Sequence, residues 1–275
     1  MKRIKILRLI VILLLIAVIG LYAYEVAVLK KDPTENLMRM LIIIAGLVIT
    51  LLRLRTSRPR RSLDFYEAQY QRELRNAFAG SVLDRKKLLC AVRLYNEDNY
   101  RKAAKYLVQL QPKCSAPDDY YAVGMFLALI YTDLHLCEQA VMMYHHLIGM
   151  NLASTTVYGN LGYVYSMMGE DEKTLSCYNS ALEIDPKNAY AWHNIARFYF
   201  DKHDFENAAE HAKKALELDS KLRQSASLLA IIYALEENKT EAEKYFHLAI
   251  ACGEKPEDLK SAIENFKQAS DAEEQ

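Results

Sequence analysis

The residues that could support chemistry are few, and their spacing is unfavourable for it. His145 and His146 are adjacent, and neighbouring side chains on a helix diverge by about 100°, which prevents them from holding one metal ion together. The acidic run "EDE" at 170–172 is placed to begin a helix, where carboxylates interact favourably with the helix dipole. No metalloprotease, P-loop, nucleophile-elbow or dinucleotide-binding motif occurs. The sequence therefore predicts no catalytic residue, no metal site, no cofactor and no enzyme.

The cysteines do not form a disulfide or zinc pattern. Their number is odd, and no two are spaced C-x-x-C. They are Cys90, Cys114, Cys137, Cys177 and Cys252. Isolated cysteines on helices usually serve as small buried residues, so we expect free thiols, as in a reducing compartment.

The charges are unevenly distributed along the chain. It contains 35 basic and 35 acidic residues in total. Residues 1–61 hold twelve of the lysines and arginines but only three of the acids, which leaves 23 basic and 32 acidic residues in the remainder. A nucleic-acid-binding surface requires a clustered basic face, so this acidic remainder predicts no nucleic-acid partner.

Two apolar segments occupy the N-terminal fifth, at about 9–29 and 37–54. Roughly 20 apolar residues rising ~1.5 Å each cross a ~30 Å hydrocarbon core, so the first segment predicts a membrane-spanning helix. The alternative is a cleaved signal peptide, but the apolar run is too long and lacks a clean cleavage site. The second segment is shorter and spans if the arginines at its ends extend to the interfaces. Its alternatives are an interfacial helix or a helix buried against the first.

Basic residues flank this predicted hairpin on its outer sides. They are Lys2, Arg3, Lys5 and Arg8 before it, and Arg53, Arg55, Arg58, Arg60 and Arg61 after it. The connecting turn has only Lys30 and Lys31, which nearby acids partly offset. The positive-inside rule then places both termini in the cytoplasm. We expect residues 1–58 to anchor a multi-pass protein with two spans in the bilayer of the cell membrane.

The rest of the chain repeats every 34 residues. A small residue is followed three positions later by tyrosine in "FLALIYTDLH", "NLGYVYSMMGE", "NIARFYFDKH" and "LLAIIYALEE". The small residues are Ala128, Gly162, Ala196 and Ala230, and the tyrosines are Tyr131, Tyr165, Tyr199 and Tyr233. Such regularity indicates an array in which each unit buries its apolar face against its neighbours.

These columns resemble the tetratricopeptide repeat (TPR) family, whose unit is a 34-residue helix–turn–helix. The copy at 155–188 carries the leucine–glycine pair, the tyrosine, Gly169 at the turn and Pro186. The copy at 189–222 adds Trp192 at the family's tryptophan position. The resemblance implies an all-α TPR solenoid, here preceded by the N-terminal transmembrane helical hairpin.

The predicted organisation follows from these patterns. It comprises two transmembrane helices (1–58), a juxtamembrane helix (59–83), a degenerate TPR (84–120), four TPR copies (121–154, 155–188, 189–222 and 223–256), and a C-terminal capping helix and tail (257–275). Gly162 is expected to pack near Thr174, and Gly169 to end its helix in the left-handed conformation. The stripe Leu63, Tyr66, Tyr70, Leu74 and Phe78 would pack on the first repeat or contact a partner.

In TPR proteins the first helix of each hairpin lines a concave groove, and the resemblance assigns that role to particular residues. The candidates are Asn160, Tyr163, His193, Asn194, Arg197 and Phe200, with Tyr190 in the same columns. They would bind a protein or peptide partner, since an asparagine amide both donates and accepts hydrogen bonds. The carboxylate clamp that holds chaperone tails is not expected, because only Asn160 among its five positions in 121–222 has the required type.

We therefore predict a membrane-anchored scaffold for protein–protein interaction, with a cytosolic TPR groove. The alternative is a structural subunit of a membrane transport, secretion or envelope-assembly complex, with the hairpin packed among other membrane helices. Polar residues inside the apolar segments would favour that alternative. Only Glu25 and Arg39 qualify, and both lie near the turn.

Overall fold

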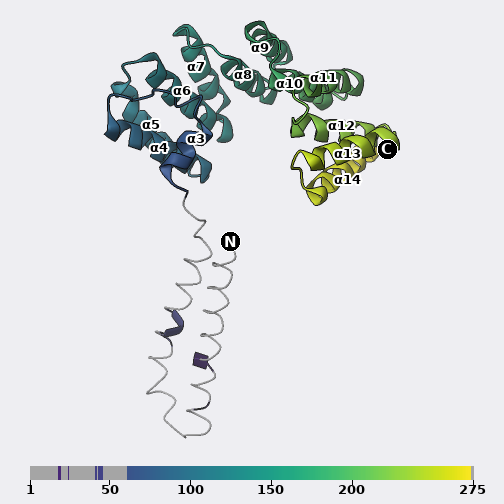
Figure 1. Ribbon diagram of the computed structural model, residues 1–275, viewed down its shortest axis with the longest axis horizontal. Helices are drawn as coiled ribbons and strands as arrows, with labels where there is room; N and C mark the ends of the chain where they lie inside the picture. The colour runs from purple at the N-terminus through teal and green to yellow at the C-terminus, as the bar shows by residue number, and fades with distance from the viewer. Residues whose placement is uncertain (1–17, 20–23, 25–40, 42, 46–60, 274–275) are drawn as a thin grey trace. The chain divides into compact units, whose positions relative to one another are not determined.

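The computed structural model describes residues 18–19, 24, 41, 43–45 and 61–273 (Figure 1). The chain divides into two units, Met1–Ser62 and Leu63–Gln275. Among the described residues, no helix is both long enough and apolar enough to cross a bilayer. Apart from the few positions given above, the predicted spans at 9–29 and 37–54 lie outside the described residues.

The second unit is built from helices, as the sequence predicts. They are α3 (Leu63–Gln69), α4 (Val82–Asn96), α5 (Tyr100–Leu110), the 3-10 turn η1 (Gln111–Lys113), α6 (Pro117–Asp133), α7 (Cys137–Gly149), α8 (Thr155–Met167), α9 (Asp171–Ile184), α10 (Ala189–Asp201), α11 (Phe205–Leu218), α12 (Arg223–Leu235), α13 (Lys239–Ala251) and α14 (Pro256–Glu273).

Helices α4 to α13 pair into successive hairpins that stack as a solenoid (Figure 1). The pairs are α4–α5, α6–α7, α8–α9, α10–α11 and α12–α13. From α6 on, each first helix also packs on the second helix of the preceding hairpin and touches the preceding first helix. Each hairpin therefore packs on the next from α4 to α13, as a repeat architecture requires.

Small residues mark where the helices of a hairpin approach most closely. Gly162 is buried, and a Cβ added to it would lie 2.5 Å from Cε1 of Tyr178. We expected Thr174 to be the neighbour of Gly162, but the nearest atoms belong to the Tyr178 ring, one turn further along α9, and to Cys177. Thr174 is also buried, but its hydroxyl donates to the Glu170 carbonyl of its own chain segment (3.0 Å).

One residue in the turn of each hairpin adopts the left-handed conformation. Gly169 does so, as predicted, with φ of +74°. The equivalent residues in the other hairpins are not glycine, and their φ values lie between 56° and 58°: Asp98, His135, His203 and Glu237. In each turn the next backbone N–H donates to a carbonyl five residues earlier, such as that of Tyr165 from Glu170 (3.0 Å). This is the Schellman type of helix ending, and it closes every one of these turns.

The segment before the first hairpin does not form the single helix predicted over 59–83. Helix α3 ends at Gln69, and residues 70–80 form consecutive turns with positive φ at Asn76 and Phe78. The carboxylate of Asp119, buried at the start of α6, accepts a hydrogen bond from the backbone N–H of Phe78 (2.6 Å). This long-range contact, which helical spacing cannot reveal, stabilises the turn.

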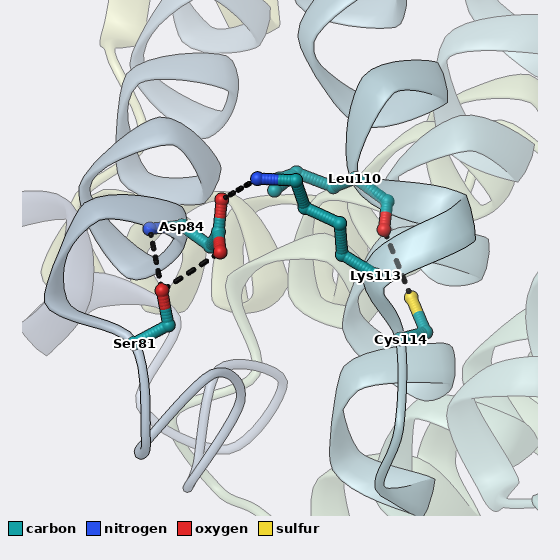
Figure 2. Close-up of polar contacts among 5 residues, drawn as sticks. All are labelled: Ser81, Asp84, Leu110, Lys113 and Cys114. Carbon is teal, nitrogen blue, oxygen red and sulfur yellow. Dashed lines mark hydrogen bonds and ion pairs between the residues drawn. The ribbon is translucent and has the colours of Figure 1, made fainter.

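A polar cluster fixes the start of α4 against the end of α5 (Figure 2). The Ser81 hydroxyl accepts from the backbone N–H of Asp84 (3.3 Å) and donates to its carboxylate (2.7 Å). Lys113 Nζ donates to the same carboxylate (2.6 Å), and these bonds lower the pKa of Asp84. Helix α4 therefore begins at a serine N-cap, and the ion pair between Asp84 and Lys113 connects the start of this helix to η1, which follows α5.

Candidate functional site

The candidate site lies on the first helices of the hairpins. Neighbouring members of the set α6, α8, α10 and α12 are in contact, so together they form one surface, which we call the groove face. Tyr163 on α8 is 55% exposed and Tyr190 on α10 is 57% exposed. These two side chains are the most exposed aromatic rings of Phe, Tyr or Trp in the part of the chain that the structure describes.

Two half-buried asparagines lie on the same helices. Asn160 is on α8, and Asn194 is on α10. Nδ2 of Asn194 would lie only 3.3 Å from a Cβ added to Gly159, so the missing side chain at Gly159 leaves room for the amide between the two helices. The structure thus brings Asn160, Tyr163 and Asn194 to one part of the groove face.

His193 takes part in helix packing. Its Nδ1 lies 3.0 Å from the hydroxyl of Ser225, a fully buried residue of α12. Burial, aided by the nearby Arg197 charge, lowers the pKa of His193 to about 4. The imidazole is therefore neutral at pH 7, and it links α10 to α12 rather than presenting a charge to a ligand.

Arg197 is the exposed cation among the predicted site residues. Its Nε donates to Asp201 Oδ1 one turn further along α10 (2.8 Å), and both side chains are exposed. Solvent screens such a pair, so it contributes little to stability. A ligand carboxylate can replace Asp201 as the partner of the guanidinium at small cost.

Phe200 does not belong to an accessible groove, and that prediction was wrong. Its side chain is 5% exposed. The Phe266 ring from α14 meets it edge-on with centroids 5.1 Å apart, and the Phe205 ring lies 5.6 Å away. Phe200 does lie on a first helix, α10, as predicted, but α14, which is outside the repeats, covers its ring.

The other end of the groove face is covered in a similar way. Phe126 of α6 stands in the same repeat column as Asn160, yet it is completely buried. Tyr70, from the turn segment after α3, contacts its ring edge-on at 5.2 Å. The Tyr70 hydroxyl donates to Asn96 Oδ1 (3.0 Å) and so holds the ring in place.

The part of the groove face that combines exposed tyrosines with half-buried asparagines lies on α8 and α10. We call it the window, and it is defined by Asn160, Tyr163, Tyr190, Asn194 and Arg197. Aromatic, amide and guanidinium groups of this kind can stack on, hydrogen-bond to and pair with a peptide. The described residues contain no group of three or more His, Cys, Asp or Glu side chains arranged to hold a metal ion.

Two hollows that the sequence did not predict lie beside the second helices. The larger, of about 870 Å³, is lined mainly by α11 together with Trp192 and Tyr233. His211 of α11 stacks between the rings of Trp192 and Tyr199, at 5.5 and 5.4 Å, and burial lowers its pKa. The smaller hollow, of about 460 Å³, includes Cys177, whose pKa burial raises to about 11.

Comparison with known proteins supports the repeat assignment. Residues 156–188 and 177–210 match two family models, each described as tetratricopeptide repeat. The chain is 30% identical to human tetratricopeptide repeat protein 6 over 60 residues, which are 22% of this chain and 12% of that protein. It is 26% identical over 96 residues to a TPR repeat-containing protein of Methanocaldococcus jannaschii, covering 34% of this chain and 17% of that protein. It spans less than a fifth of the length of either relative.

Solved structures show the same fold. A thermophilic TPR protein of Thermus thermophilus superposes with a TM-score of 0.55 at 21% identity, covering 66% of this chain and 97% of that chain. A tetratricopeptide repeat protein from Parabacteroides merdae gives a TM-score of 0.52 at 20% identity, covering 69% and 75%. At these identities the likeness concerns the helical solenoid alone.

Proposed function

Since this chain is a tetratricopeptide repeat protein, we propose that it is a non-enzymatic scaffold whose window binds a peptide segment of a protein partner. In this proposal residues 1–58 anchor the scaffold in the cell membrane and the repeats face the cytosol. The anchor rests on the apolar segments at 9–29 and 37–54 and on the basic residues that flank them.

The observation that carries the proposal is the pair of exposed tyrosines on neighbouring helices. Tyr163 and Tyr190 are each more than half exposed, although most aromatic rings of the repeats are packed into the core. Tyrosine and arginine are the residue types enriched where binding energy concentrates in protein interfaces. Two tyrosines beside Arg197 are therefore suited to a protein ligand.

The asparagines determine which kind of ligand fits. An amide side chain can donate to a backbone carbonyl and accept from a backbone N–H of the same peptide unit. Asn160 and Asn194 are half-buried, which shields such bonds from water, and they stand on adjacent helices. We expect the ligand to be an extended segment with an aromatic or apolar side chain against the tyrosines and a carboxylate near Arg197.

Selection of peptides from a display library, with the full chain in lipid nanodiscs as the target, tests this proposal. The selected peptides are then measured against Tyr163→Ala/Tyr190→Ala and against Tyr106→Ala, which removes an exposed tyrosine of α5 outside the groove face. We expect at least about tenfold weaker binding to the double variant and unchanged binding to the control. Failure to select any peptide, or equal binding to all three proteins, would refute peptide recognition by the window.

A further inference from the structure

Helix α14 departs from the stacking rule that the repeats follow. In the repeats, each first helix from α6 on packs on the second helix just before it and on the preceding first helix. Helix α14 follows α13 in sequence, but its extensive contact is with α12. It therefore does not occupy the place that the first helix of another repeat would take.

The position of Phe266 shows where α14 lies. Its ring meets that of Phe200 on α10 at 5.1 Å. Packed helix axes are about 8–10 Å apart, so α12 would separate α10 from a helix that simply continued the stack. Contact between Phe266 and Phe200 requires α14 to cross the groove face of α12 instead.

The residues beneath α14 differ in kind from those of the window. Phe200, Leu228 and Ile231 are between 5% and 8% exposed and belong to one apolar cluster with Leu259 of α14. The same three repeat columns in α8 contain Ser166, Asn160 and Tyr163, all polar and none buried. The groove face thus changes from polar to apolar where a helix covers it.

The pattern of α14 is that of a helix bound in a groove. Leu259, Ala262, Ile263 and Phe266 follow one another at close helical spacing and all belong to its apolar face. Spacings i, i+3, i+4 and i+7 are typical of amphipathic helices that bind in apolar grooves. The other α14 side chains that the structure describes are exposed.

Polar contacts hold the chain just before α14, whereas the helix itself becomes less buried towards its C-terminal end. Before the helix, Glu254 accepts a hydrogen bond from the Ser227 hydroxyl (3.2 Å) and lies 3.6 Å from Arg223 Nε. Gly253, with φ of +97°, ends α13, and its backbone N–H donates to the Ile250 carbonyl (3.0 Å). Within the helix Leu259 is 3% exposed, but Phe266 is still 37% exposed. The distal part of α14 can therefore separate from the groove face while α12 and α13 stay paired.

We propose that the apolar end of the groove face, formed by Phe200, Leu228 and Ile231, is a docking site for an amphipathic helix of a partner protein. Helix α14 occupies this site within the chain, and the partner helix binds by displacing it. The partner helix then carries the same apolar spacing as α14, with a large aromatic residue opposite Phe200. This inference deepens the proposed function and rests on it, but its test needs no ligand at the window.

A labelled synthetic peptide of residues 254–273 serves as the partner helix. Its binding to the full chain in nanodiscs is followed by fluorescence anisotropy for the unaltered protein, for Phe266→Ser and for Lys267→Ser. An intramolecular helix has an effective concentration near millimolar, so the peptide competes only when the internal copy is weakened. We expect the peptide to bind the Phe266→Ser chain at least about tenfold more tightly than the other two, and a peptide carrying the same substitution to bind none of them.

Hydrogen exchange of the unaltered full chain provides the independent measurement. Amides of 259–268 should exchange at least about tenfold faster than those of α12, because local opening precedes global unfolding. Equal protection of α14 and α12 would overturn the proposal, since α14 would then be an integral part of the core. Fast exchange of α14 without peptide binding to the Phe266→Ser chain would also overturn it. Neither outcome bears on the window, whose residues are unaltered in this experiment.

Discussion

The ring of Tyr178 lies directly against the backbone of Gly162, so that a Cβ on the glycine would approach Cε1 to 2.5 Å and Cδ1 to 2.7 Å. The same Cβ would also lie 3.2 Å from Cβ of Cys177. The contact joins α8 to α9 within the hairpin. It explains in atomic terms why this repeat column contains only glycine and alanine.

Gly162→Ala should destabilise the repeats, although alanine is the better helix former. Overpacking costs about 1–3 kcal/mol, against a gain in helix propensity of about 0.5–1 kcal/mol. We expect a net loss of up to about 2.5 kcal/mol in the free energy of unfolding of a 61–275 fragment, measured by urea denaturation. Gly149→Ala, at the end of α7 where an added Cβ meets nothing within 4 Å, is the matched control and should be neutral or stabilising.

Glycine in the hairpin turns should stabilise the solenoid. His135 and Glu237 have φ of 56°, a conformation that costs a residue with a Cβ about 1 kcal/mol or more. We expect His135→Gly and Glu237→Gly each to raise the free energy of unfolding by about 0.5–1 kcal/mol after the larger entropy of the unfolded chain is counted. Glu236→Gly, one residue earlier at φ of −75°, should lower it instead. Stabilisation by all three changes would contradict this explanation.

The half-buried His193 should make the repeats less stable in mild acid. Its pKa in the folded protein is about 4, below the usual value of 6.5, so the unfolded chain binds more protons between these two pH values. The free energy of unfolding should therefore fall as pH is lowered from 6.5 towards 4. His193→Gln removes the titration while a side-chain amide can still reach the Ser225 hydroxyl. Urea denaturation at about pH 7 and about pH 5 should show a smaller pH dependence for this variant than for the unaltered protein.

Reporter fusions test the predicted topology. A reporter active only in the cytosol, joined after residue 275, should be active, whereas one joined after residue 34, between the two apolar segments, should be silent. A periplasmic or extracellular reporter should give the reverse pattern. An external signal from the C-terminal fusion would mean that the second apolar segment does not span, and it would reverse the proposed location of the repeats.

The local parts of the fold could be predicted because the information is local. The 34-residue columns of Leu, Gly and Tyr identify the helix pairs, and Gly169 identifies the end of α8. The nearest neighbour of Gly162 could not be predicted, because sliding one helix along its axis by one turn, about 5.4 Å, exchanges Thr174 for Tyr178 without changing the pattern. The same limit applies to the segment 70–80, whose apolar spacing is helical but whose backbone is held by Asp119 from a distant helix.

The sequence predicted which helices carry the candidate site residues, but not which of those residues are accessible. Asn160 and Tyr163 are on α8 and Asn194 and Arg197 on α10, all exposed or half-buried, and their role in binding a partner stays a prediction. Phe200 belongs to the same columns, yet its exposure depends on α14, which no repeat pattern describes. Whether a groove residue is accessible is a property of the segments that flank the repeats.

The covering of both ends of the groove face limits the length of the segment that a partner can present to the window. The window lies on α8 and α10, and helix axes about 8–10 Å apart are bridged by roughly three residues of extended chain at ~3.3 Å each. A recognition motif for the window is thus about three to six residues long, a size at which few anchors are available and affinity is modest. If residues 1–58 anchor this chain as proposed, a partner on the same membrane is present at a raised effective concentration, which offsets the modest affinity of so short a motif.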